Sequence, residues 1–305
     1  MIRASSENKG QDTLVSGEAL QRWWHWAQGI IPAPERESGL RELKQFLRAF
    51  TGLSPLEITL RRFPPQIHLK LPLTELQERW QRRWQERVPL QYLIGVAHWH
   101  DLELVVTPSV LIPRPETEEL LAVVAATVPP WQQQGHWLDL GTGSGAIAIG
   151  LARLFPAALI HAVDCSSEAL EVAQVNIQKY ALGDRVRCYV GNWFDPIVPL
   201  QGQVQGIVSN PPYIPTSVVA TLQPEVQYHE PLLALDGGTD GLQAIRQILE
   251  TAPEYLQPQG WLFIELMATQ GKAVAALAMA TQAYERVEIL RDLSGHDRFL
   301  LAQTP

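Results

Sequence analysis

The chain has 305 residues, of which 46% are hydrophobic and 18% charged, as in soluble proteins with at least one large core. The formal net charge of -8 disfavours tight binding to a phosphate backbone, although a local basic face is compatible with it. Two cysteines, Cys165 and Cys188, cannot form a disulfide framework, and no export signal or membrane-spanning run is recognisable. We therefore expect a cytoplasmic protein that binds neither membranes nor nucleic acid directly.

Apolar residues recur at helical spacing in the first part of the chain. They run from Leu20 to Ala27, from Leu43 to Phe50 and from Leu73 to Trp84, with prolines between these stretches. The pattern predicts a small all-α helical bundle over residues 1–90, whose core contains the tryptophans.

Residues 91–110 alternate enough to predict a β-hairpin or an extended linker. The next stretch, Leu111 to Glu118, ends where a helix is expected to begin. Acidic residues from Glu116 to Glu119 would lie in its first turn, where the helix dipole favours negative charge.

From residue 136 onward, strand patterns alternate with helix patterns. Strands are predicted at His136–Leu140, Ala158–Val163, Val186–Val190, Gly206–Ser209 and Trp261–Leu266, with two more at Tyr284–Leu290 and Arg298–Ala302. Helices are predicted at Ala146–Leu154, Ser167–Tyr180 and Thr239–Leu256. This order predicts an α/β domain over residues 111–305: a doubly wound, mostly parallel sheet of seven strands, with ligands at the carboxyl ends of the strands.

A glycine-rich turn follows the first of these strands. Its residues are Gly141, Thr142, Gly143, Ser144 and Gly145, and Asp164 follows the second strand. Glycines let the backbone approach a ligand closely at a helix N-terminus, and the aspartate can accept hydrogen bonds from ribose hydroxyls. The turn alone does not separate a nicotinamide enzyme from a methyltransferase.

The fourth strand leads into Asn210, Pro211, Pro212 and Tyr213. The side-chain oxygen of Asn210 and the carbonyl of Pro211 can accept the two N–H bonds of a planar amino group, and Tyr213 offers a flat face. The prolines fix the backbone around these acceptors. Methyl transfer to an amide or exocyclic amine needs acceptors that hold the amino group in this way, whereas hydride transfer does not. We therefore assign catalysis to Asn210 and Tyr213, with no histidine base and no metal.

Together these segments resemble the protein-(glutamine-N5) methyltransferases of peptide chain release factors, the HemK/PrmC family. The resemblance rests on the glycine turn, Asp164, the Asn-Pro-Pro-Tyr segment, Leu111 to Glu118, and Glu230-Pro231 followed by Asp236 to Leu242. Asn-Pro-Pro-Tyr also occurs in DNA adenine and some RNA methyltransferases, but the Ile-Pro-Arg-Pro-Glu-Thr-Glu segment after a helical domain is more specific.

The resemblance implies a class I, Rossmann-like methyltransferase domain that uses S-adenosylmethionine. The acceptor would be the glutamine of the Gly-Gly-Gln motif in class 1 release factors, recognised through the helical bundle. Residues 141 to 145 would surround the methionine part of the cofactor, Asp164 its ribose and Trp193 its adenine. Asn210 would lie between cofactor and substrate, and Pro211 to Tyr213 would complete the glutamine pocket.

Two positions depart from the family pattern. Asn192 stands where an acidic residue is common, and Met267 where a glycine is usual. Three other functions remain open on the sequence alone: an adenine-N6 DNA or RNA methyltransferase, an NAD-dependent oxidoreductase, and a non-catalytic binding module. The acidic charge disfavours the first, Asn210 to Tyr213 are unexplained in the second, and the intact glycine turn disfavours the third.

Overall fold

The computed structural model describes residues 13–305. Contacts within the chain divide it into two compact units, one ending at Gly95 and the other beginning at Val96. The predicted end of the bundle, residue 90, lies inside the first unit. In the described part of the chain, no helix is both long and apolar enough to cross a bilayer.

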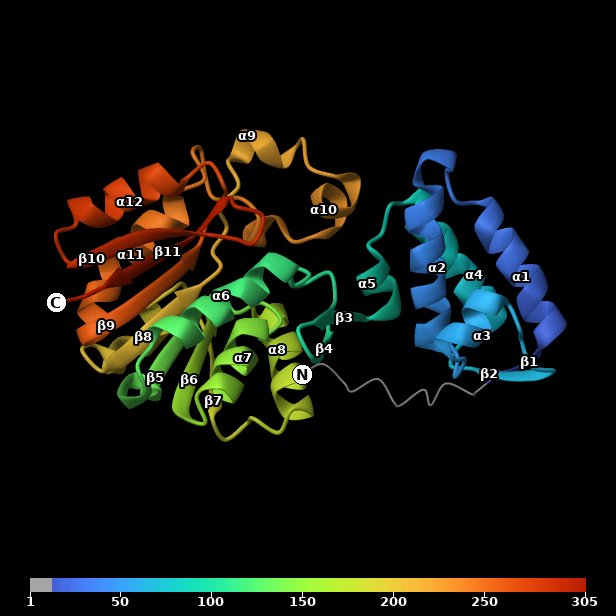
Figure 1. The fold of residues 1–305 in the computed structure, drawn as a ribbon, viewed down its shortest axis with the longest axis horizontal. Helices are drawn as coiled ribbons and strands as arrows, with labels where there is room; N and C mark the ends of the chain where they lie inside the picture. Colours follow the sequence, from blue (N-terminus) through green and yellow to red (C-terminus); the bar gives the residue numbers. More distant parts are fainter. Residues whose placement is uncertain (1–12) are drawn as a thin grey trace. The chain divides into compact units, whose positions relative to one another are not determined.

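The first unit is a helical bundle with a small sheet. Its elements are α1 (Gly17–Gly29), η1 (Ala33–Glu35), α2 (Arg36–Phe50), α3 (Pro55–Leu60), α4 (Leu73–Gln85), α5 (Leu90–Ile94), and the strands β1 (Thr13–Ser16) and β2 (Gln66–Leu69) (Figure 1). The three predicted helices are present. The prediction of an all-α domain is wrong, because β1 and β2 pair antiparallel. No hairpin pattern could reveal this pair, because helices α1, α2 and α3 separate β1 from β2 in the sequence.

Tryptophans fill the core of this unit, as the helical spacing predicts. Trp23, Trp24, Trp80 and Trp84 are all buried. The indole N–H of Trp80 donates to the carbonyl of Ala27, which joins α4 to α1 at 3.0 Å. These aromatic side chains therefore have a structural role in the bundle.

The second unit is an α/β domain. It contains β3 (Val96–Trp99), β4 (Leu102–Val105), α6 (Pro115–Thr127), η2 (Pro130–Gln132), β5 (Gln134–Leu140), α7 (Ala146–Leu154), β6 (Ala157–Asp164), α8 (Ser167–Lys179), β7 (Val186–Val190), η3 (Asp195–Leu200), β8 (Val204–Ser209), α9 (Thr216–Val219), α10 (Pro224–His229), η4 (Leu232–Ala234), α11 (Gln243–Tyr255), β9 (Leu256–Glu265), α12 (Gly271–Ala280), β10 (Arg286–Arg291) and β11 (Asp297–Gln303). The pairing of β3 with β4 confirms the predicted hairpin.

The main sheet has seven strands in the order β10-β11-β9-β8-β5-β6-β7. Strands β7, β6, β5, β8 and β9 pair in parallel, and β11 runs antiparallel to both of its neighbours. The predicted doubly wound, mostly parallel sheet of seven strands is thereby confirmed. The chain moves outward from β5 to β7 and returns to β8 on the other side of β5. The carboxyl ends of β5 and β8 are therefore the switch point at which such sheets bind ligands.

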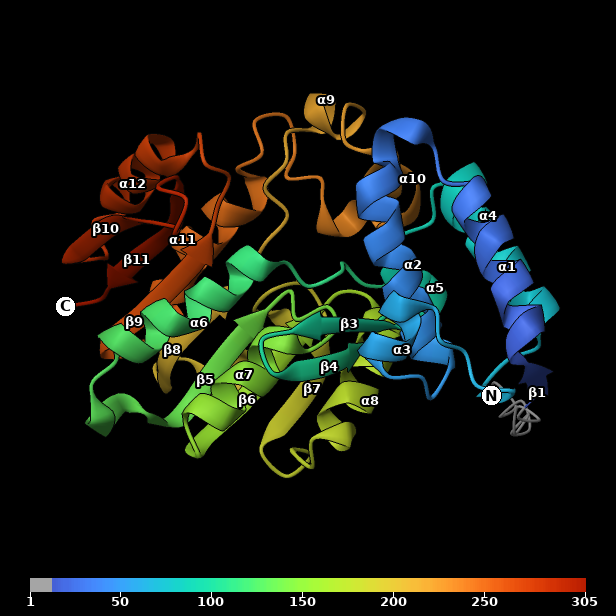
Figure 2. The ribbon, with the colours of Figure 1, turned by 45° about the vertical axis from the view of Figure 1, so that its right-hand side comes forward.

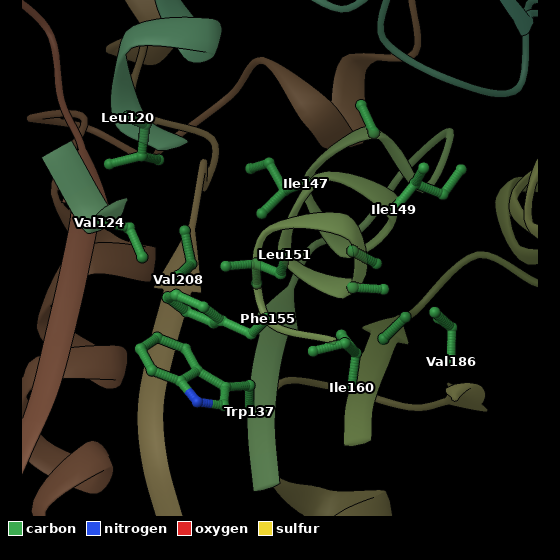
Figure 3. Packing of buried hydrophobic residues seen from close by; sticks show 14 of the residues in the cluster. Leu120, Val124, Trp137, Ile147, Ile149, Leu151, Phe155, Ile160, Val186 and Val208 are labelled. Atoms are coloured by element: carbon green, nitrogen blue, oxygen red, sulfur yellow. The ribbon is translucent and has the colours of Figure 1, made fainter. Parts of the chain in front are cut away.

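Each face of the sheet is covered by helices. Helices α6, α7 and α8 pack on one face, and α11 and α12 on the other (Figures 1 and 2). Each face of the sheet has its own hydrophobic core, and successive strand residues alternate between the two cores. Trp137 lies in the core beneath α6, α7 and α8, and its neighbour Leu138 lies in the core beneath α11 and α12. Figure 3 shows Trp137 beside Phe155, with ring centroids 4.8 Å apart. Gly206 leaves room for this ring, because a Cβ there would lie 2.3 Å from it.

The predicted helix from Thr239 begins later than expected, at Gln243. Gly238 and Gly241 have φ of 86° and 74°, and this left-handed backbone makes a turn before the helix. The side chain of Asp240 accepts the backbone N–H of Leu242 within that turn. The glycines before Gln243 therefore form a turn and are not part of the helix.

Candidate active site

The glycine turn at the end of β5 has the backbone form that the sequence predicts. Gly141, Gly143 and Gly145 have φ of 75°, 53° and 83°, a region that other residues rarely adopt. The N–H groups of Gly141 and Thr142 both donate to the carbonyl of Val163, at 2.9 and 3.0 Å. These bonds fix the turn to the end of the neighbouring strand β6.

A buried carboxylate supports the turn from inside the domain. Oδ2 of Asp139 accepts hydrogen bonds from the hydroxyl of Thr142 and from the backbone N–H of Ala148, at 2.5 and 2.9 Å. Complete burial raises the pKa of Asp139 to about 7. The other carboxylate oxygen is buried without a partner among the described residues.

Asp164, at the end of β6, lies beside the same turn. Its Oδ2 accepts the N–H of Gly143 at 2.8 Å, and its Oδ1 accepts the N–H of Ser166 at 2.9 Å. Burial raises the pKa of Asp164, while these backbone donors oppose that rise. Each carboxylate oxygen can accept a further hydrogen bond, so Asp164 can both hold the turn and bind ribose hydroxyls.

The end of β7 contributes an aromatic wall. Trp193 has φ of 45°, and it lines the cavity together with Gly191 and Asn192. A Cβ added to Gly141 would lie 3.7 Å from the Trp193 ring and 3.9 Å from the carbonyl oxygen of Asn210. The glycine turn, Trp193 and Asn210 therefore meet at one place. Asn192, which departs from the family pattern, is part of this cavity.

Asn210 follows β8 directly. Ser209, the last residue of β8, donates its hydroxyl to the carbonyl of Leu140 at 2.7 Å, which joins the ends of β8 and β5. Asn210 and Pro212 line the cavity, whereas Pro211 and Tyr213 are not among its lining residues. The described structure thus brings Asn210 to the predicted cofactor side, but Pro211 and Tyr213 of the predicted glutamine pocket do not line this cavity.

Tyr213, Glu265 and Thr117 form a buried hydrogen-bonded group that ends at Asn210. The Tyr213 hydroxyl bonds to Glu265 Oε1 at 3.1 Å, and the Thr117 hydroxyl bonds to Glu265 Oε2 at 2.7 Å. The side-chain nitrogen of Asn210 donates to Thr117 Oγ1 at 3.1 Å. Burial raises the pKa of Glu265, and its bonds to the two hydroxyls act in the opposite direction. Burial also raises the pKa of Tyr213.

One cavity of about 450 Å³ lies over these strand ends. Its volume falls within the range of small-molecule and cofactor sites. Gly141, Gly143, Asp164, Trp193 and Asn210 line it, whereas Thr142, Ser144 and Gly145 are not among the lining residues and shape the turn behind it. Flexible glycines, a carboxylate and an indole ring suit the methionine, ribose and adenine parts of S-adenosylmethionine. Among residues 13–305, no three His, Cys, Asp or Glu side chains group as metal ligands.

A partly buried ion pair holds the segment before α6 against the loop after α10. Nη2 of Arg114 lies 2.7 Å from both carboxylate oxygens of Glu230, whose side chain is 1% exposed. Leu111 and Pro231, on either side of this pair, line the cavity. The pair therefore explains why the sequence motifs around Arg114 and Glu230 belong together.

Sequence reasoning missed several residues that support the site. Asn176, on the buried face of α8, donates to the carbonyls of Ser144 and Val105 and accepts the N–H of Val105. Gln270 donates to the carbonyl of Tyr213 at 2.9 Å and accepts the N–H of Met267 at 3.0 Å. A polar residue on the apolar face of a helix was the available signal for Asn176.

Comparison with known proteins decides the family. The "Methyltransferase small domain" model matches residues 117–223. A release factor glutamine methyltransferase of Synechocystis sp. is 47% identical over 301 residues, which cover 97% of this chain and 99% of that protein. The chain belongs to the release factor glutamine methyltransferase family.

Other relatives agree with this assignment. The release factor glutamine methyltransferase of Gloeobacter violaceus is 44% identical over 274 residues, 90% of this chain and 94% of that one. Among solved structures, the hMettl16 catalytic domain in complex with a MAT2A 3'UTR hairpin superposes with a TM-score of 0.54. At 14% identity, over 76% of this chain and 81% of that one, this likeness shows the fold alone. As a member of the release factor glutamine methyltransferase family, the chain is an S-adenosylmethionine-dependent N-methyltransferase.

Proposed function

We propose that the chain methylates the side-chain amide nitrogen, N5, of the glutamine in the Gly-Gly-Gln motif of class 1 peptide chain release factors. Family membership supports the methyl donor and this class of acceptor. The observation that carries the proposal is that Asn210 lines the same cavity as the glycine turn and Asp164. An amide acceptor can therefore be gripped directly beside the cofactor.

The bound cofactor is proposed to lie across the ends of β5, β6 and β7. The turn at residues 141–145 would hold its methionine part, Asp164 its ribose hydroxyls and Trp193 its adenine. S-adenosylmethionine supplies a methyl group that its sulfonium makes electrophilic. The chain's own task is to bring a weakly nucleophilic nitrogen into line with that methyl group.

Orientation of the substrate amide is the main contribution of Asn210. Its side-chain oxygen would accept one N–H bond of the glutamine. The second acceptor predicted from the sequence, the Pro211 carbonyl, belongs to a residue that does not line the cavity. Each such bond contributes only about 0.5–1.5 kcal/mol net to binding, whereas good positioning of reactants contributes up to roughly 7–11 kcal/mol. The value of Asn210 therefore lies in geometry. The substrate nitrogen would lose its proton to water, since no histidine base is assigned.

The experiment that tests this function is tandem mass spectrometry of a class 1 release factor after incubation with the chain and labelled S-adenosylmethionine. One label on the Gly-Gly-Gln glutamine is expected, and a release factor with that glutamine replaced serves as control. DNA and RNA are offered as parallel acceptors, because an adenine amino group presents the same pair of N–H bonds. Label on nucleic acid without label on the release factor would contradict the proposal.

The helical unit is proposed to recognise the release factor, because a single glutamine offers few atoms to a small pocket. Cross-linking mass spectrometry of the full chain with a release factor is expected to give cross-links to residues 13–95. Cross-links confined to residues 96–305 would contradict this role.

We further propose that the protein works in the cytoplasm, where release factors act, without direct contact with nucleic acid or membranes. Fractionation of cells that express a tagged chain tests the compartment, and recovery with the membrane pellet would contradict it.

A further inference from the structure

The side chain of Asn210 is useful to a glutamine substrate in only one of its two orientations. An asparagine amide has an oxygen that accepts hydrogen bonds and a nitrogen that donates them. A substrate amide nitrogen carries N–H bonds and has to meet an acceptor. The oxygen of Asn210 must therefore face the cavity. If the amide were reversed, the NH₂ group of Asn210 would face the NH₂ group of the substrate, and no hydrogen bond could form between them.

The network behind Asn210 determines which way this amide points. The hydroxyls of Thr117 and Tyr213 both donate to Glu265, which in its ionised form offers only acceptors. The single hydroxyl proton of Thr117 is thereby used. Toward Asn210, Thr117 Oγ1 offers only a lone pair, which matches the observed bond from the Asn210 side-chain nitrogen at 3.1 Å.

Burial makes this order of donors and acceptors strict. Glu265 is 1% exposed and Thr117 4% exposed, so water cannot easily replace a missing partner. No described residue donates to Oδ1 of Asn210, and Asn210 lines the cavity. The acceptor atom is therefore left for a ligand.

Resting on the function proposed above, we propose that Thr117 and Glu265 are positioning residues that hold the Asn210 amide with its oxygen toward the substrate. The relay joins α6, the end of β8 and the end of β9, which lie far apart in the sequence. Glu265 also binds the Tyr213 hydroxyl, so one carboxylate holds the Asn-Pro-Pro-Tyr segment directly at Tyr213 and through Thr117 at Asn210.

Paired substitutions at Thr117 test the relay. Thr117→Val keeps the shape and removes the hydroxyl, whereas Thr117→Ser keeps the hydroxyl. We expect Thr117→Val to lower kcat about 10- to 100-fold, as misplacement of a reacting group does, and Thr117→Ser to restore kcat to within about threefold. The dissociation constant of S-adenosylmethionine, measured by calorimetry, is expected to change less than about threefold in both.

A matched control is Thr304→Val, which removes a buried hydroxyl bonded to the carbonyl of Gln257 at the other end of β9. This variant is expected to keep the wild-type kcat. Thermal unfolding of all variants checks folding. Thr117→Ala provides a second variant without the hydroxyl if valine is not accommodated.

Hydrogen exchange gives a readout that does not depend on turnover. The side-chain N–H₂ protons of Asn210, followed by NMR in the chain without substrate, are expected to exchange slowly in wild type and Thr117→Ser and at least about tenfold faster in Thr117→Val.

Unchanged kcat and unchanged exchange in a folded Thr117→Val would overturn the relay while leaving the proposed function intact. Failure of the wild-type chain to methylate any release factor would instead overturn the proposed function.

Discussion

The cofactor side and the substrate side of the cavity are built by different means. On the cofactor side, backbone groups shape the wall of the cavity. They are three glycines with positive φ, and N–H groups that donate to Val163 and Asp164. On the substrate side, one short segment is held by side chains from distant parts of the chain, Thr117 and Glu265. The first construction gives a local turn, and the second gives a defined orientation of one amide.

This difference implies that mutations on the two sides of the cavity should have different effects on activity. Damage to the glycine turn should weaken cofactor binding, because backbone conformation shapes that wall. Damage to the relay should slow the reaction while cofactor binding persists, because the relay only orients Asn210. The predictions below test this separation from the largest expected effect to the smallest.

Gly141→Val tests most directly whether the backbone of the glycine turn shapes the cofactor side of the cavity. The residue has φ of 75°, which costs a non-glycine residue about 1–2 kcal/mol, and valine would extend toward Trp193 and the Asn210 carbonyl. We expect the dissociation constant of S-adenosylmethionine to rise at least about 30-fold in calorimetry. Gly183→Val, at an exposed glycine with no neighbour within 4 Å of its Cβ position, is the matched control. Equal affinity in both variants would refute the backbone account.

Asn176→Leu tests the support beneath the turn. It removes the bonds to Ser144 and to both backbone groups of Val105, and each buried group left without a partner costs about 1–3 kcal/mol. We expect the melting temperature to fall by about 5–15 °C, with weaker cofactor binding. Gln174→Leu, an exposed change on the same helix, should shift it by less than about 2 °C. A similar loss in both variants would count against a special role for Asn176.

Asp139→Asn should change how stability depends on pH. Folding raises the pKa of Asp139 from 3.8 to about 7, so the folded state holds a proton that the unfolded state releases. The stability contributed by that protonation is present below pH 4 and lost as pH rises toward 7. We therefore expect the variant, compared with wild type, to gain melting temperature steadily between pH 4 and pH 7. The measurement is thermal unfolding of the cofactor-free chain, and a difference that is flat with pH would contradict it.

Much of the α/β domain could be predicted because its signals are local. Helix α7 and strand β7 have the predicted bounds, and the glycine turn follows β5 as expected. The strands β1 and β2 could not be predicted, because their pairing joins segments far apart in sequence, whereas the equally short β3 and β4 adjoin each other in a hairpin.

The candidate site was predictable only in part. One cavity is lined by Gly141, Gly143, Asp164, Trp193 and Asn210, since each lies at or just after the end of a strand of the same parallel sheet. Thr117 lies in a segment that carries the family resemblance, but the sequence assigned no role to it or to Glu265, because their role arises from contacts across the fold. The assignment of a catalytic role to Tyr213 stays a prediction, and its hydroxyl is bound to Glu265.

The central claim is that Asn210 orients a substrate amide and leaves cofactor binding to other residues. Kinetics of Asn210→Ala, together with calorimetry of S-adenosylmethionine, test it most directly. We predict that kcat for methylation of a release factor falls about 100-fold or more, while the cofactor dissociation constant changes less than about threefold. Losses of equal size in kcat and in cofactor affinity, or an unchanged kcat, would contradict the account.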